Sequence, residues 1–431
     1  MSGHDTVPRT ARVDSSLDLL REGYTFVSAR CDALGSDLFS TRLMGRRVTC
    51  MRGAAAAELF YGREGLVRNG AIPSNTAHLL QDEASVQTLE GEAHQHRKRL
   101  FLGMLGADAI GSFTKQIDAA WDELSARRRP GSRVHLYDEM NHVLTLAALR
   151  WCGLADEARA LHRRTRELQS MIEYAGSFGP GNWRARLRRR GTERWARSVL
   201  ESVRRRSSAT STDQHVAPDI LNDPDIPNDM VQLIASHEEH GQPLPLDVAA
   251  VELLNVLRPI VAISRFVVFA AVALQEHPQW KRTFASGDMS RLVAFTHEVR
   301  RYYPFFPMVP ARTTQDVEFA GHLLPTGSWL LLDLYGTNHD DRLWDAPQSF
   351  APERFDDWAG DPYTLVPQGG GAYSTSHRCP GERFTVAAIA HMVRLLSRLD
   401  PDVPAQDMTY GLSTMPALPR SGFIFVTPKP R

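Results

Sequence analysis

The chain has 431 residues, of which 42% are hydrophobic and 23% are charged, and its 50 basic residues equal its 50 acidic residues. Such a composition is typical of a soluble globular protein and excludes a mainly disordered or fibrous chain. Because the formal net charge is zero, no overall field favours nucleic acid or an anionic membrane.

Cysteine usage and hydropathy both indicate an intracellular protein. The four cysteines are far apart and form no CxxC pair, so we expect neither a disulfide framework nor a cysteine-rich zinc site. The N-terminal residues are polar and show no signal peptide. The most apolar stretch, residues 248–274, is interrupted by Glu252, Arg258 and Arg265, which favours a buried helix over a membrane span. We therefore expect a cytoplasmic protein without a membrane span.

Segments of helical periodicity, separated by prolines, make up most of the chain. The predicted helices cover residues 141–152, 155–172, 247–276 and 290–303. Asp247 is the expected N-cap of the third helix, and Pro304 ends the fourth. Strand signals cluster late, at residues 317–319, 329–333 and 422–426. Without βαβ alternation, this order predicts a mostly-α fold, a helical body with small β-sheets.

A glycine-rich loop near the end of the chain surrounds a single cysteine, Cys379. Residues 367–381 read PQGGGAYSTSHRCPG, and a helical pattern resumes at Glu382. A thiolate just before a helix N-terminus is favoured by the helix dipole and by the unsatisfied N–H groups there. Taken alone, the loop is equally compatible with a surface loop that happens to contain a cysteine.

Three motifs follow one another in a specific order. Glu298 and Arg301 form an ExxR pair on one helical face, residues 352–355 read PERF, and the Cys379 loop comes next. This order resembles the cytochrome P-450 superfamily, and the resemblance spans most of the chain. It implies a single cytochrome P-450 domain over residues 1–431, with residues 1–40 at its periphery and a buried haem b.

The resemblance also implies roles for these residues. Cys379 matches the thiolate that ligates haem iron, and Gly381 belongs to the same haem-binding loop. A thiolate ligand pushes electron density onto the iron and favours O–O cleavage. Glu298, Arg301 and Arg354 match a structural ion network, in which the loss of one buried member costs roughly 3–5 kcal/mol.

The predicted long helix departs from the usual family pattern. Typical monooxygenases carry an acid–alcohol pair there, which delivers protons, whereas this chain reads NVLRPIVAIS with Arg258-Pro259 in the middle. This pair, with EVRRYYPFFP and LDLYGTNHD elsewhere, resembles the fatty-acid peroxygenase branch of the superfamily. The branch implies hydroxylation of a fatty acid by hydrogen peroxide at the α or β carbon. Terminal alkenes are then a minor product, and no redox partner is obligatory.

Arg258 cannot replace the missing acid, because a guanidinium stays protonated. It is suited to bind a carboxylate bidentately, and an arginine facing an apolar interior needs an anionic partner. We predict that Arg258 anchors the fatty-acid carboxylate, which itself acts as the general acid–base. Pro259 removes one helical N–H and is expected to bend the helix, so that Arg258 faces inward. The alternative is a surface arginine beside an incidental kink.

The same resemblance places three more residues near the haem. Gln87 lies just before the GEAHQHRK segment. In this branch a histidine there accompanies decarboxylation, and a glutamine accompanies hydroxylation. His94 and Lys98 are expected to contact the haem propionates. The alternative for all three is a polar segment away from the haem. Gln81 replaces an aromatic residue that is usual in the branch, so chain-length preference is not predicted.

Two rival enzymes share the haem site. One is a redox-partner-dependent cytochrome P-450 monooxygenase, and the absent acid–alcohol pair argues against it. The other is a peroxygenase that mainly decarboxylates and forms alkenes.

Two polar segments suggest other functions. Residues 184–206 are strongly basic and could contact phosphates. We interpret this segment as a solvated helix and expect no nucleic-acid binding, since an apolar stripe can run along it, through Trp183, Leu187, Trp195 and Val199. His237 and His240 form an HxxH pair without the HExxH arrangement of a zinc enzyme. We interpret them as part of a solvated charged stretch.

Overall fold

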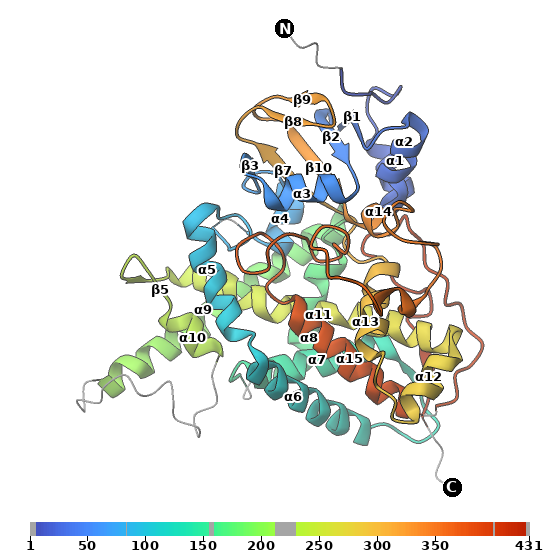
Figure 1. Ribbon diagram of the computed structural model, residues 1–431. Coiled ribbons are helices and arrows are strands. Elements are labelled where there is room, and N and C mark those ends of the chain that lie inside the picture. Colours follow the sequence, from blue (N-terminus) through green and yellow to red (C-terminus); the bar gives the residue numbers. More distant parts are fainter. Residues whose placement is uncertain (1–5, 83, 155–158, 212–229, 400, 428–431) are drawn as a thin grey trace.

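The computed structural model describes residues 6–82, 84–154, 159–211, 230–399 and 401–427 (Figure 1). The α-helices are α1 (Ser16–Glu22), α2 (Phe26–Leu34), α3 (Ala54–Gly62), α4 (Ser74–Leu80), α5 (Gly91–Met104), α6 (Ala107–Ala126), α7 (Leu136–Trp151), α8 (Leu161–Glu173), α9 (Pro180–Ser211), α10 (Met230–Ser236), α11 (Leu246–Glu276), α12 (Pro278–Ala285), α13 (Leu292–Tyr302), α14 (Leu334–Asn338) and α15 (Glu382–Arg398). The strands are β1 (Leu38–Leu43), β2 (Arg46–Met51), β3 (Leu66–Val67), β4 (Arg133–His135), β5 (Glu238–Glu239), β6 (Gln242–Pro243), β7 (Met308–Thr313), β8 (Val317–Phe319), β9 (His322–Leu324), β10 (Trp329–Asp333) and β11 (Ile424–Val426).

Helix α11 is the centre of the helical body and packs against α7, α8, α9 and α15 (Figure 1). It is long and apolar enough to cross a membrane, but 89% of its most apolar window is buried inside the protein. A helix that is apolar on all sides is expected to be buried in this way. The predicted buried helix over residues 248–274 is therefore confirmed.

Helix boundaries differ from the predicted ones by a few residues. The N-cap of α11 is Pro245, so the prediction of Asp247 as N-cap is wrong. Asp247 lies in the first turn instead, where its carboxylate still complements the helix dipole. The second predicted helix corresponds to α8, which begins at Leu161, and residues 155–158 lie outside the described residues.

A five-stranded sheet with the order β1-β2-β10-β7-β3 lies beside the helical body (Figure 1). β2 and β10 are parallel, and the other neighbours are antiparallel. β10 is buried on both faces, because Leu330 and Leu332 pack with α3 while Trp329 and Leu331 pack with α2.

Strands β8 and β10 lie where the sequence predicts them, but the prediction that strands cluster late in the chain is wrong. β1 and β2 form a hairpin near the N-terminus, with Leu38 opposite Met51. The outer end of this hairpin is exposed and carries Arg42, Arg46 and Arg47. These arginines interrupt the alternation of apolar and polar residues by which a strand is predicted from sequence. Pairing with the distant β10 stabilises this hairpin, and a local pattern does not report such pairing.

The N-terminal segment, expected at the periphery, contributes to the core. Tyr24 and Phe26 are at most 1% exposed. The Tyr24 hydroxyl donates to the carbonyl of Phe305 at 2.5 Å, which ties the segment to the region after α13.

Candidate functional site

The Cys379 loop folds tightly because three of its positions have no room for a side chain. Gly369 and Gly371 have φ values of +88° and +82°. A Cβ atom on Gly369 would lie 2.9 Å from the Tyr61 hydroxyl, and one on Gly370 would lie 2.6 Å from the Pro362 carbonyl. Only glycine satisfies both the conformation and the close approach. The loop thereby places Cys379 directly before α15, which begins at Glu382 as the sequence predicts.

Hydrogen-bond donors surround the sulfur of Cys379. The side-chain amide of Gln368 lies 3.8 Å from Sγ, and the backbone N–H of Gly381, the N-cap of α15, also donates to the sulfur. Burial raises the pKa of the Cys379 thiol, while the Gly381 N–H opposes this shift. Cys379 is partly exposed, whereas the other three cysteines are buried. A sulfur that accepts N–H hydrogen bonds at a helix N-terminus is suited to be a metal-ligating thiolate.

Lys98 and His94 project from α5 toward this loop. The Lys98 ammonium donates to the backbone carbonyls of Ser376 and, at 2.8 Å, of Arg378. Burial lowers the pKa of Lys98 to about 8, so the ammonium keeps its charge at neutral pH. The ring centroids of His94 and His377 lie 4.0 Å apart. Burial lowers the pKa of His94 to about 3. His94 is therefore neutral. Lys98 stabilises the cysteine loop by hydrogen bonds from α5.

A second ion pair behind the loop was not predicted. Arg300 donates to Glu382 at 2.5 Å and to the side-chain oxygen of Gln368 at 3.2 Å, and Arg378 also binds Glu382. These contacts position Gln368 beside the sulfur. The sequence shows each residue, but no spacing rule reports a pairing across 82 residues.

The predicted ion network is present. Arg301 binds Glu298 through two hydrogen bonds of 2.7 and 2.8 Å, and both side chains are fully buried. Arg354 donates to the same carboxylate at 3.2 Å, and the backbone N–H of Ala351 does so at 2.8 Å. The Arg301 guanidinium also reaches the carbonyls of Asn338, Pro347 and Ser349. Glu298 thus joins α13 to the PERF turn, residues Pro352–Phe355.

Replacing Glu298 by alanine should lower the free energy of unfolding by about 3–5 kcal/mol, because it leaves two arginines without their shared carboxylate. Thermal unfolding of the haem-loaded protein measures the effect. Glu353→Ala is the matched control, because Glu353 lies in the same turn but is exposed. A loss of stability equal to that of the control would contradict the network's role.

Arg258 and Gln87 lie close together, joined by a residue that the sequence analysis did not select. Arg258 is 7% exposed and donates to the side-chain oxygen of Asn255 at 3.2 Å. The side-chain amide of Asn255 donates to Gln87 at 3.3 Å. The alternative of a surface arginine at position 258 is therefore wrong, and the loop containing Gln87 meets α11 at this point.

Arg258 has no carboxylate partner among the residues that the structure describes. Burial lowers its pKa to about 9, and the nearby charge of Arg189 acts in the same direction. This value still lies above neutrality, so the guanidinium remains charged at pH 7. A buried cation of this kind is costly unless an anion binds it.

The nearest buried acid on α11, Glu252, is already bound by other groups. It is fully buried and accepts hydrogen bonds from Arg97 at 2.6 Å, from the Val86 backbone at 2.8 Å and from Asn255 at 2.9 Å. Its position six residues before Arg258 places it about 1.7 helical turns away. Glu252 therefore fixes the loop before Gln87 and orients Asn255 without neutralising Arg258.

One residue of α11 beside Arg258 is exposed. Pro259 is exposed, although its neighbours Arg258 and Ile260 are buried. Helix α11 continues on both sides of this proline. The guanidinium of Arg258 also lies close enough to Cys379 for the thiolate charge to raise the arginine pKa. The structure thus brings Cys379, Arg258 and Gln87 to one region between α11 and α15.

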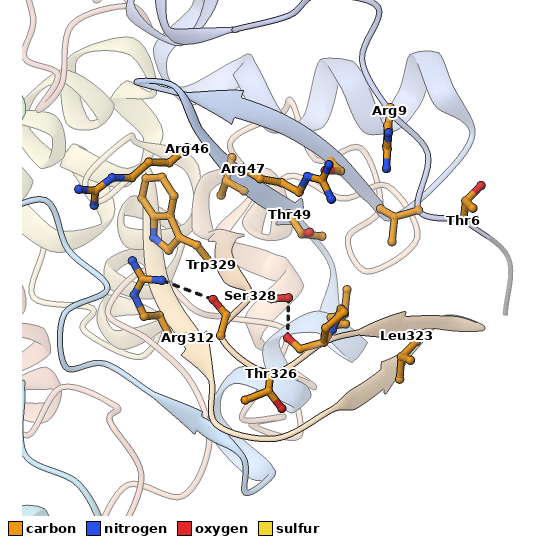
Figure 2. A pocket seen from close by; sticks show the side chains of 16 residues that line it. Thr6, Arg9, Arg46, Arg47, Thr49, Arg312, Leu323, Thr326, Ser328 and Trp329 are labelled. Atoms are coloured by element: carbon orange, nitrogen blue, oxygen red, sulfur yellow. Dashed lines mark hydrogen bonds between the residues drawn. The ribbon is translucent and has the colours of Figure 1, made fainter.

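A separate cavity of about 740 Å³ lies beside the sheet (Figure 2). Arg9, Arg46, Arg47 and Arg312 are among its lining residues, and none of the lining residues is acidic. None of the predicted site residues lines this cavity. It is therefore distinct from the candidate site.

The basic segment, residues 184–206, lies within α9. Trp183 and Leu187 are exposed, whereas Trp195 and Val199 pack against the core, so the predicted stripe is only half buried. Arg189, on the same helix, is buried and binds Glu193 at 2.6 Å. This segment is therefore not uniformly solvated.

Comparisons with known proteins agree with this geometry. A family model described as Cytochrome P450 matches residues 274–419. The taxoid 2-alpha-hydroxylase of Taxus canadensis is 23% identical, over 92% of this chain and 83% of its own. Among solved structures, cytochrome P450EX alpha (CYP152N1) with myristic acid is 36% identical, covers 98% of both chains and superposes with a TM-score of 0.88. A variant of cytochrome P450 OleT in complex with arachidonic acid is 30% identical over 98% of both chains, with a TM-score of 0.89.

Proposed function

The chain belongs to the cytochrome P450 superfamily and is similar over its full length to CYP152 fatty-acid peroxygenases, and on that premise we propose that it hydroxylates fatty acids with hydrogen peroxide. Hydroxylation at the α or β carbon is the main reaction, and decarboxylation to a terminal alkene is the minor one. No redox partner is required. The proposal includes a cytoplasmic location, which suits the free cysteines.

The family implies a haem-thiolate cofactor, and we propose haem b with Cys379 as its ligand. The glycine cradle of the loop and the donors around Sγ fit a thiolate ligand. When bound, the haem supplies the iron centre at which O–O cleavage occurs, and the thiolate favours that cleavage. His94 and Lys98 lie beside the loop, and we retain them as proposed partners of the haem propionates. Gly381 fixes the sulfur through its N–H.

The observation that carries the proposal is the buried guanidinium of Arg258, which has no carboxylate partner in the part of the chain that the structure describes. Glu252 is a buried acid on the same part of α11, but Arg97 binds it, so it does not neutralise Arg258. A fatty-acid carboxylate provides the missing anion, and a guanidinium can hold it through two hydrogen bonds. Two relatives carry a fatty acid in their solved structures, myristic acid and arachidonic acid respectively.

The bound carboxylate performs the proton transfer that the chain lacks. Arg258 holds it in its ionised form, and the remaining lone pair of one carboxylate oxygen can accept a proton from one peroxide oxygen and return it to the other. Asn255 and Gln87 orient the guanidinium and border the same space. The protein thus provides the position of the acid–base, and the substrate provides the group itself.

The decisive experiment incubates the purified haem protein with hydrogen peroxide and a panel of fatty acids, with products identified by mass spectrometry. The acids should be hydroxylated, and their methyl esters should not, because an ester neither binds Arg258 as an anion nor transfers the proton. A parallel incubation with NADPH, ferredoxin and ferredoxin reductase, with catalase to remove peroxide, should give no product. Equal turnover of the ester, or turnover only with the reductase, would contradict the proposal.

Gln87→His should raise the share of alkene product while peroxide use continues. The substitution keeps Arg258 and Asn255 but changes the hydrogen-bonding group next to the substrate. Product ratios of the two proteins at equal peroxide measure the effect. A native protein that makes mainly alkene would contradict the role proposed for Gln87 and leave that of Arg258 intact.

A further inference from the structure

Three side chains with metal-ligating atoms meet on the far side of Arg97 from the candidate site. They are His96 on α5, His237 just after α10, and Glu239 on β5. One ligand atom from each residue lies within 4.8 Å of the other two. The two histidine rings are 5.1 Å apart between centroids, and His237 Nε2 lies 3.9 Å from Glu239 Oε1.

His237 contributes a ring nitrogen that lacks a hydrogen bond. Its Nε2 atom is buried and has no hydrogen-bond partner among the described residues, although the side chain as a whole is 14% exposed. A buried polar atom without a partner requires an explanation, and a bound ion is one of the usual ones. The nitrogen faces the carboxylate of Glu239, so the orphaned atom belongs to the cluster.

Glu239 retains capacity for a metal ion although Arg97 binds it. Arg97 donates to Oε1 at 2.5 Å and to Oε2 at 2.7 Å, which uses one lone pair of each oxygen and leaves another. The same guanidinium also binds Glu252, so two carboxylates share one positive charge. A cation beside Glu239 would balance the excess negative charge of this group.

His96 closes the cluster from α5. Its Nε2 atom lies 3.0 Å from the carbonyl oxygen of Glu238, and its Nδ1 atom lies 3.3 Å from the Arg99 guanidinium. Both contacts lie near the protein surface, so ligation replaces one of them at little cost. His240, which the sequence pattern pairs with His237, is exposed with a φ of +53° and does not belong to the cluster.

We propose that His96, His237 and Glu239 bind one divalent transition-metal ion, zinc in the first instance. Two imidazoles and one carboxylate are a ligand set that zinc accepts, and the partly exposed position leaves a fourth site to water. Tetrahedral zinc with bonds of about 2.0–2.2 Å places ligand atoms roughly 3.4 Å apart. The 3.9 Å between His237 Nε2 and Glu239 Oε1, and the separations of up to 4.8 Å within the cluster, must therefore shorten by side-chain rotation when the ion binds.

The metal joins the β5–β6 hairpin to α5. Arg97 then connects the ligand Glu239 to Glu252 on α11, and hence to the loop that carries Gln87. The expected role is structural, because no residue of the cluster reaches Cys379 or Arg258. Haem binding and peroxide chemistry therefore do not depend on it.

Equilibrium dialysis of the haem-loaded protein against buffered zinc tests the site, with zinc and iron counted by elemental analysis. In the haem-loaded protein the Cys379 thiolate is not free to bind zinc. A His142→Ala background removes the exposed His142–His162 pair, which is a competing zinc site. We expect one zinc per haem in this background, with at least a tenfold loss of affinity in His237→Ala and in Glu239→Gln. His240→Ala is the matched control and should retain the zinc.

Thermal unfolding provides the second readout. Zinc should raise the unfolding temperature of the parent and of His240→Ala, but not that of His237→Ala. If one variant fails to fold, the other still tests the site. The proposal is overturned if the parent takes up no zinc at micromolar concentration, or if both variants bind zinc as tightly as the parent.

Discussion

Replacing Arg258 by alanine should abolish fatty-acid binding and peroxide-driven turnover together, because one contact serves both. The guanidinium is buried. Among the described residues, Asn255 is the one side chain to which it donates a hydrogen bond. Removing one member of a buried ion pair costs about 2–5 kcal/mol, which corresponds to a loss of affinity from roughly 30-fold to several thousand-fold. Fatty-acid titrations of the haem spectrum measure the affinity, and product formation measures turnover.

Two further variants separate charge from geometry. Arg258→Lys keeps the positive charge but loses the planar pair of donors, so its affinity should lie between those of the parent and the alanine variant. Arg188→Ala is the control, because Arg188 is an exposed arginine on α9 and its removal should change neither quantity. If Arg258→Ala binds the acid as tightly as the parent does, Arg258 is not the anchor.

The sequence predicts the helical body better than the sheet, for a physical reason. The apolar residues of α11 are contiguous, so their pattern reports burial directly, and only its N-cap is misplaced. β1 and β2 are stabilised by pairing with β10, which lies almost 300 residues later in the chain, as the pairing of Cys50 with Leu331 shows. Such pairing leaves no mark on the local sequence.

The candidate site also contains residues that the sequence predicts and residues that it does not. Cys379, Glu298 and Arg301 stand in motifs with fixed spacing, so the sequence singles them out, and the structure places Cys379 just before α15 and pairs Arg301 with Glu298. Asn255 and Gln368 lie within the segments around Arg258 and Cys379, but the sequence gives them no role. Their roles appear only when α11 meets the Gln87 loop and Arg300 meets the cysteine loop. Polar residues that act as bridges depend on the tertiary fold, which periodicity does not report.

The surroundings of Glu252, the buried acid on α11, argue against its use as the proton donor of a monooxygenase. The carboxylate is fully buried, and burial raises its pKa, but Arg97, Asn255 and the Val86 backbone all stabilise it. A proton-delivering acid must exchange protons with its surroundings, whereas Glu252 is enclosed by fixed donors. This enclosure supports the proposal that the substrate carboxylate, held by Arg258, transfers the proton.

Replacing Cys379 by alanine should abolish the red-shifted Soret band of the reduced, carbon-monoxide-bound haem, which the family resemblance implies for a haem-thiolate. No other cysteine can substitute, because Cys31, Cys50 and Cys152 are buried elsewhere in the fold. Cys50→Ala is the matched control and should keep the band. A normal band in the Cys379 variant would refute the assignment of the ligand.

Gln368→Leu distinguishes ligation from positioning at the same sulfur. The variant removes the amide 3.8 Å from Sγ but keeps the sulfur itself and the Gly381 N–H. The red-shifted band should therefore persist. The reduction potential of the haem should fall, because a thiolate that accepts fewer hydrogen bonds donates more charge to iron. A spectroelectrochemical titration measures the potential. An unchanged potential would show that Gln368 serves the fold of the loop through Arg300 and Thr385 rather than the sulfur.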